Sequence, residues 1–154
     1  MSGTMFGGSA FALDIGVRND TGGAVTAGDI LMVDARTSAD DGFLAVKPET
    51  GGTEIGPFTM QGVVLAPDGL SIGNGDDCII RVLGVTRAKV KTGATVTAGQ
   101  LGRAEDGTGL LLASTAVANV GSYAEINYVS KFIILETVTG ATATPDAKVL
   151  VRGI

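Results

Sequence analysis

Residues 21–29 read Thr-Gly-Gly-Ala-Val-Thr-Ala-Gly-Asp, and residues 92–100 read Thr-Gly-Ala-Thr-Val-Thr-Ala-Gly-Gln. The second stretch follows the first at an offset of 71 residues (92 − 21), and six of the nine positions are identical. In each copy the stretch leads into a short apolar run, a Gly turn and a second short apolar run. Because Gly adopts the conformations that tight turns need, each copy predicts a turn that directs the chain into a strand. The repeat therefore predicts two pseudo-symmetric halves of one small barrel, since a solenoid needs at least three copies.

Short apolar runs of strand length recur on both sides of these copies. The predicted strands are 30–33, 43–46, 60–66, 78–91, 110–113, 132–135 and 148–152. Turn residues such as Pro67-Asp68-Gly69 separate them. From Val85 to Lys91 polar and apolar residues alternate with a period of two, and Gly84 predicts a bulge or bend before them. The one stretch whose Ala and Leu residues favour a helical turn is 110–120.

The predicted fold class is therefore all-β, a small β-barrel of short strands with Gly-rich turns and an internal pseudo-repeat. The 24 glycines follow no collagen-like period, and a hydrophobic fraction of 45% argues against disorder. Residues 1–14 are Gly-rich and weakly patterned, which predicts an extended N-terminal arm in front of one domain spanning 15–154. The apolar positions of that arm are Met5, Phe6, Phe11 and Leu13.

The composition excludes most enzyme chemistry. The chain has no His, so no Ser-His-Asp or Cys-His nucleophile can be assembled, and one Cys without His cannot build a zinc site. Cys78 lies in an apolar run and is expected to be a small buried residue. The acidic pairs Asp40-Asp41 and Asp76-Asp77 lack the spacing of a calcium loop. We therefore predict no enzyme, no catalytic residue, no cofactor and no metal.

Charge and hydropathy limit the classes of molecule that this protein is expected to bind. The net charge of −5 is divided into −8 over residues 1–79 and +3 over residues 80–154. An acidic chain with 5% aromatics is a poor nucleic-acid binder, whereas this asymmetry suits contact with proteins or with copies of itself. The N-terminus lacks the pattern of a signal peptide, and no apolar stretch has the length of a membrane span. We expect a protein made in a cytoplasm that binds neither nucleic acid nor membrane.

Four stretches together resemble a known family. They are 28–34, 42–48, 59–66 and 77–90, and in order and pattern they are similar to the lambda-type head decoration (cement) proteins of tailed phages. The turn at Val96-Thr97-Ala98-Gly99 is also similar to small phage proteins of the β-tulip pattern. The resemblance covers residues 15–113 and rests on pattern and order, without an invariant chemical motif. Residues 114–154 have no counterpart in it.

The resemblance implies a structural virion protein on the capsid exterior. It implies a homotrimer at three-fold and quasi-three-fold positions that binds the major capsid protein and stabilises the expanded shell. The N-terminal arm would add to a strand of the capsid protein. Met5, Phe6, Phe11 and Leu13 would then fill pockets between subunits.

Two alternatives stay open at this point. One is a phage tail or head-fibre component, or a bacterial surface β-module. The other, from a different class, is a lipoyl- or biotinyl-like carrier barrel, which shares the Val-x-Ala-Gly turn. A carrier needs a Lys at a hairpin tip, whereas Lys89 and Lys91 fall within a predicted strand.

Overall fold

The computed structural model describes residues 12–34, 43–48, 60–114, 130–140 and 145–153. Within these ranges all regular structure is β, which confirms the predicted class, and no helix there is long and apolar enough to cross a membrane. The strands are β1 (Leu13–Asn19), β2 (Val25–Thr26), β3 (Ile30–Asp34), β4 (Leu44–Val46), β5 (Gln61–Leu65), β6 (Ser71–Ile72), β7 (Asp77–Lys89), β8 (Leu101–Ala104), β9 (Leu111–Ala113), β10 (Phe132–Ile134) and β11 (Asp146–Arg152).

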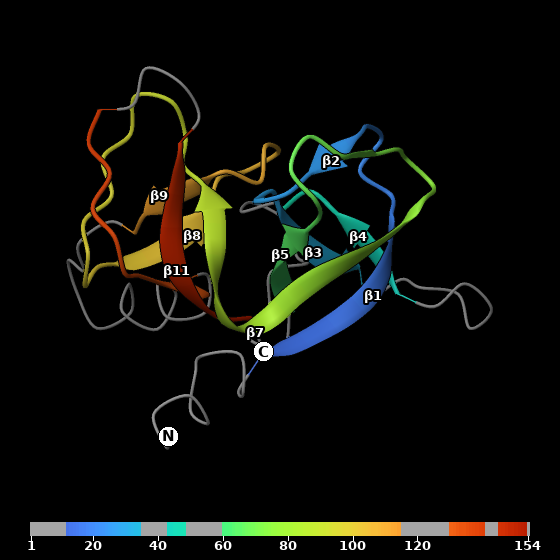
Figure 1. Cartoon of the computed structure of the whole chain (residues 1–154), viewed down its shortest axis with the longest axis horizontal. Coiled ribbons are helices and arrows are strands. Elements are labelled where there is room, and N and C mark those ends of the chain that lie inside the picture. The colour runs from blue at the N-terminus through green and yellow to red at the C-terminus, as the bar shows by residue number, and fades with distance from the viewer. Residues whose placement is uncertain (1–11, 35–42, 49–59, 115–129, 141–144, 154) are drawn as a thin grey trace.

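Nine of these strands form one mixed sheet in the order β1-β4-β3-β5-β7-β11-β10-β8-β9, and β2 pairs with β6 in a small second sheet. The molecule has two lobes side by side, and the long strand β7 runs from one lobe into the other (Figure 1). The sheet as a whole does not close into the single small barrel that the sequence predicted. The reason is that β7 is long enough, at 13 residues, to pair with different strands along its two halves.

The pairings of each lobe form a cycle. In the first lobe an additional pairing of β1 with the start of β7 joins the two ends of the β1-β4-β3-β5-β7 series. In the second lobe the series runs β7-β11-β10-β8-β9 and returns to the end of β7 through a parallel bridge between Val90 and Leu111. We call these two cycles the first half and the second half.

The two halves have the same plan, strand for strand. β1, β3, β4, β5 and the start of β7 correspond to the end of β7, β8, β9, β10 and β11. The direction of every pairing agrees, including the parallel pairing of β1 with β4 and the parallel bridge from Val90. Arg18 pairs with Asp77 in the first half as Lys89 pairs with Asp146 in the second. The predicted internal pseudo-repeat is confirmed.

The repeated turn has the same backbone in both halves. Gly28 has φ +88° and Gly99 has φ +90°, values that favour Gly. The amide of Gly28 donates to Val64 O at 3.0 Å, and that of Gly99 donates to Ile134 O at 2.8 Å. The side-chain acceptors also agree, because Asp29 accepts from Thr26 N as Gln100 accepts from Thr97 N. The repeated sequence therefore encodes one supersecondary unit used twice.

Each half encloses its own apolar core. The first core contains Val17, Val25, Leu31, Ala45, Val64, Cys78, Ile80 and Val82. The second contains Ala88, Val90, Val96, Ala104, Leu111, Phe132, Ile134, Ala147, Val149 and Val151. Ile30 and Val63, from the outer face of the first half, also belong to the second core. The halves therefore pack into one another, and burial of this apolar surface joins them.

Two sequence predictions within β7 and β9 are settled by the structure. Gly84 has φ +115°, consistent with the predicted bend, and β7 curves strongly between the lobes (Figure 1). The stretch considered for a helical turn begins instead with strand β9, because its apolar residues complete the second core; residues 115–120 lie outside the described residues.

Candidate functional site

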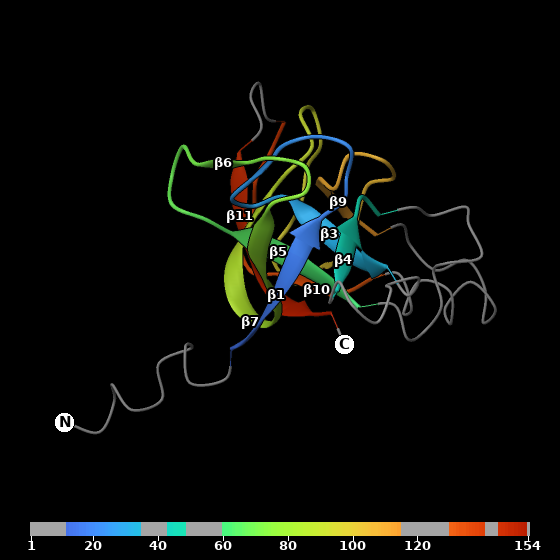
Figure 2. The same ribbon diagram turned by 90° about the vertical axis from the view of Figure 1, so that its right-hand side faces the viewer.

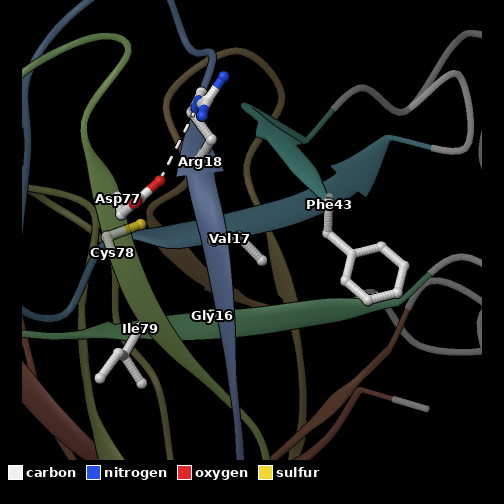
Figure 3. Close-up of a pocket in the computed structure, with 7 residues that line it drawn as sticks. All are labelled: Gly16, Val17, Arg18, Phe43, Asp77, Cys78 and Ile79. Carbon is white, nitrogen blue, oxygen red and sulfur yellow. Dashed lines mark ion pairs between the residues drawn. The ribbon is translucent and has the colours of Figure 1, made fainter. Parts of the chain in front are cut away.

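A surface hollow of about 490 Å³ lies over the first half, beside β1 (Figure 3). Its lining residues come from β1, from the residue before β4 and from the start of β7. They are Gly16, Val17, Arg18, Phe43, Asp77, Cys78 and Ile79. We call this hollow the Phe43 cleft. It opens to solvent, and the Phe43 ring, which is 52% exposed, borders it on the side away from β7.

The cleft exists because β1 is only partly covered along one edge. Among the described residues, β7 pairs with β1 from Leu13 to Arg18, whereas β4 pairs with it only at Arg18 and Asn19. Figure 2 shows β1 running between β7 and β4. The Arg18 amide donates to Phe43 O at 2.8 Å. Because strand residues two apart point their backbone groups to the same edge, Gly16 presents its amide and carbonyl to the part of this edge that lies beyond β4.

Glycine at position 16 makes the cleft deeper. A Cβ placed there would meet no atom within 4 Å, so the space over this residue is open. Its pairing partner on β7 is Ile79, whose side chain is 51% exposed. No described strand pairs with this part of the β1 edge. A strand edge beside exposed apolar side chains is the arrangement that binds another polypeptide.

Ion pairs border this apolar surface. Arg18 Nε lies 3.7 Å from Asp77 Oδ1, and Arg81 Nε lies 2.8 Å from Asp14 Oδ1. The hydrogen bond from Arg81 lowers the pKa of Asp14, against the opposing effect of desolvation, and the same contact raises the pKa of Arg81. The two pairs set the polar rim of a surface whose centre is apolar.

The structure places one of the four predicted arm residues. Leu13 is the first residue of β1, pairs with Leu83 and is 44% exposed. Met5, Phe6 and Phe11 lie outside the described residues. Leu13, Ile79 and Leu83 are all partly exposed on the β1–β7 ribbon, and we call this group the Leu13 strip.

The other side chains singled out in the sequence have structural surroundings. Cys78 is buried, and burial raises the pKa of its thiol, as the prediction of a small core residue expected. Lys89 lies in β7, and its Nζ is 3.0 Å from Asp29 Oδ1. A carrier domain would instead need this lysine at an exposed hairpin tip. The described residues contain no group of three or more His, Cys, Asp or Glu side chains suited to a metal. Asp40 and Asp41 lie outside the described residues.

Sequence reasoning missed the cleft residues Phe43, Gly16 and Ile79. Phe43 and Ile79 stand in apolar runs, which predict strands but do not show that these two side chains face outward. The alternation along β7 carried the missing signal, because Cys78, Ile80 and Val82 face the core and the residues between them must face outward.

Comparisons with known proteins found similarity to solved structures but none to a family model or to a curated protein. A solved structure, the crystal structure of the head fiber gp8.5 N base in bacteriophage phi29, is similar to it with a TM-score of 0.46 and 10% identity. The match covers 91% of this chain and 93% of that chain. This TM-score does not establish a shared fold.

Proposed function

We propose that this chain is a non-enzymatic structural protein of a tailed phage. It binds the major capsid protein on the capsid exterior as a decoration protein and stabilises the expanded shell. The single observation that supports this proposal best is the Leu13 strip. It is an exposed apolar surface that lies where residues 1–12 lead into β1.

The N-terminal segment and the strip are suited to one contact. Residues 1–13 carry no charged side chain and include Met5, Phe6 and Phe11, so the segment can add to a strand of another protein without burying a charge. Leu13 and Leu83 then continue the apolar contact onto the folded body. The rim pair Arg81–Asp14 stays in water and contributes to orientation more than to affinity.

Stabilisation of the shell follows from linkage and needs no chemistry. A protein that binds the expanded shell and not its alternatives stabilises it by about 2.7 kcal/mol per site when its free concentration is 100 times Kd. If three copies act as one trimer, as the resemblance implies, their segments bind together and their effective concentration rises. Modest contacts repeated over many sites then strengthen the whole shell.

Co-sedimentation with capsids tests this proposal. Deleting residues 1–11 leaves β1 whole, because β1 begins at Leu13. We expect the shortened protein to keep its β-rich circular-dichroism spectrum and to lose co-sedimentation. The control is Leu70→Glu, a substitution of an exposed leucine between β5 and β6. This variant should still co-sediment with shells. Retention of the shortened protein on shells at the full-length level would contradict the proposal.

Copy number separates this function from the alternatives. Decoration predicts a number of copies on purified particles close to that of the capsid protein, whereas a fibre or tail component predicts few. Quantitative gel analysis of particles measures it. An intact mass with a prosthetic-group adduct would support the carrier alternative instead.

A further inference from the structure

The Phe43 cleft has a counterpart in the second half. Arg18 corresponds to Lys89, since their strand partners are Asp77 and Asp146. Phe43 corresponds to Gly109, because each stands two residues before the residue whose carbonyl binds the start of the repeated turn (Asp20 N to Ala45 O; Lys91 N to Leu111 O). The site beside Arg18 and Phe43 in the first half therefore corresponds to the site beside Lys89 and Gly109 in the second half.

In the second half this place is filled by the first half. The Lys89 amide donates to Gly28 O at 3.0 Å, and the Ile30 amide donates to Gly109 O at 2.9 Å. Gly28 to Ile30 are thus inserted between β7 and the residues before β9. Ile30 and Val63 are fully buried in this contact. A Cβ on Gly28 would stand 3.0 Å from Lys89 Cγ, so the approach is close.

In the first half nothing within the described residues is inserted there. The Arg18 amide donates directly to Phe43 O, and the Phe43 cleft lies open beside this bond. The open cleft of one half is the filled contact of the other.

The second half also carries the matching insert. Gly99, Leu101 and Ile133 stand where Gly28, Ile30 and Val63 stand in the first half. Gly99 shares the φ of Gly28, so the turn has the shape that fits such a contact. Leu101 and Ile133 are only half-buried, whereas their counterparts have no exposed surface. We call Gly99, Leu101 and Ile133 the Leu101 patch.

We infer that copies of this chain bind one another head to tail, with the Leu101 patch of one copy inserted in the Phe43 cleft of the next. The contact repeats the one between the two halves. The Arg18 amide would donate to Gly99 O of the second copy, and the second copy's Leu101 amide would donate to Phe43 O. One hydrogen bond opens and two form, while Phe43, Leu101 and Ile133 leave water. This inference goes beyond the proposed function, because it needs no capsid.

A head-to-tail contact has a signature that a two-fold contact lacks. Each copy carries one cleft and one patch, so the wild-type chain assembles beyond a dimer and closes into a ring if the rotation allows. Phe43→Glu removes the cleft and keeps the patch, whereas Leu101→Glu removes the patch and keeps the cleft. Each variant alone should be a monomer. An equal mixture of the two should form a 1:1 dimer and nothing larger, because only one cleft and one patch remain intact.

Light scattering after size-exclusion chromatography measures these masses, with circular dichroism to show that each variant is folded. Leu70→Glu, an exposed leucine elsewhere on the first half, is the matched control and should keep the wild-type mass. A monomeric wild type at every concentration, or variants that keep its mass, would overturn the inference. So would a mixture that stays monomeric, provided the covalent test below also fails.

Cysteine pairs give that covalent test, which also serves if a glutamate variant does not fold. In the second half Ile30 and Gly109 are joined by a backbone hydrogen bond, so their counterparts Leu101 and Phe43 of two copies should be close enough for a disulfide. In a Cys78→Ala background, which removes the one native thiol, Phe43→Cys mixed with Leu101→Cys should give a cross-linked dimer under mild oxidation, and neither variant alone should. Equal cross-linking of either variant by itself, or none in the mixture, would contradict the contact.

Discussion

The two halves of this protein share a backbone plan and differ in how side chains complete it. In the first half the turn after β1 is held by a buried amide: Asn19 donates to Gly23 O, Ile72 O and Gly73 O and accepts from Thr21. In the second half the corresponding residue is Val90, which packs in the apolar core. A polar network and an apolar contact therefore stabilise the same turn.

The cores differ by an exchange of volume. The first half has Leu31 on β3 and Ala45 on β4, whereas the corresponding pair on β8 and β9 is Gly102 and Leu111. A Cβ on Gly102 would stand 2.9 Å from Leu111 Cδ1. Each core is therefore filled by one leucine, which comes from β3 in the first half and from β9, the counterpart of β4, in the second half. The comparison teaches that the backbone plan is fixed by turns and register, while packing volume can move between strands.

The largest effect should come from breaking this exchange. Gly102→Leu places a second large side chain against Leu111, and Leu111→Ala leaves a cavity; each should cost about 3 kcal/mol of unfolding free energy. The double variant rebuilds the first half's Leu–Ala arrangement and should cost clearly less than the sum of the two. Urea denaturation of the four proteins measures this. Additive costs would show that the two positions do not share one space.

Removing the buried amide should come next. Asn19→Val installs the residue of the second half but removes the side-chain amide that donates to Gly23 O, Ile72 O and Gly73 O, so we expect a loss of about 3 kcal/mol or slightly less. Denaturant midpoints measure it. The control is Asn74→Ala, which removes one exposed hydrogen bond to Gly22 N and should cost less than about 1 kcal/mol. Equal costs would contradict the role given to Asn19.

A smaller effect is expected where the halves meet. Asp29 and Lys89 form an ion pair of 3.0 Å, with side chains 11% and 25% exposed. Asp29→Asn keeps an acceptor for Thr26 N and removes the charge, so it should destabilise the protein by about 1–2 kcal/mol. Thermal unfolding measures this, and Gln100→Glu, the exposed counterpart in the second half, should change the midpoint little. A larger shift for Gln100→Glu would mean that the pair does not join the halves.

The smallest effect concerns pH. The first half pairs Asp14 with Arg81 where the second pairs Val85 with Leu150. Because the folded pKa of Asp14 is lowered, its contribution is present above the unfolded value of about 4 and is lost as pH falls through the folded pKa. For a partly exposed pair this is below about 1 kcal/mol.

The double variant Asp14→Val with Arg81→Leu tests that pH dependence. It should keep near wild-type stability at pH 7 and lose less stability than the wild type below pH 4. Unfolding curves over that pH range give the comparison, and parallel pH profiles for the two proteins would count against it.

Sequence predicted what is local and missed what depends on partners far along the chain. The turns at Gly28 and Gly99 kept their residues in both halves because only Gly fits that backbone, so the repeat was visible. The volume exchange between Leu31 and Gly102 erased identity in the strands, so their correspondence was not visible. The Phe43 cleft requires β1 to lie between β4 and β7, and no short-range pattern specifies that pairing.

Strand β7 also determines how the molecule can come apart. It supplies the last strand of one half and the first strand of the other without a break at Gly84. A cut of the chain at Gly84 would divide the strand that both halves share. No flexible linker joins the halves, because β7 itself is the connection between them. Heat or denaturant should therefore unfold both halves in one cooperative transition. A mechanical force applied to one half is transmitted to the other through strand β7.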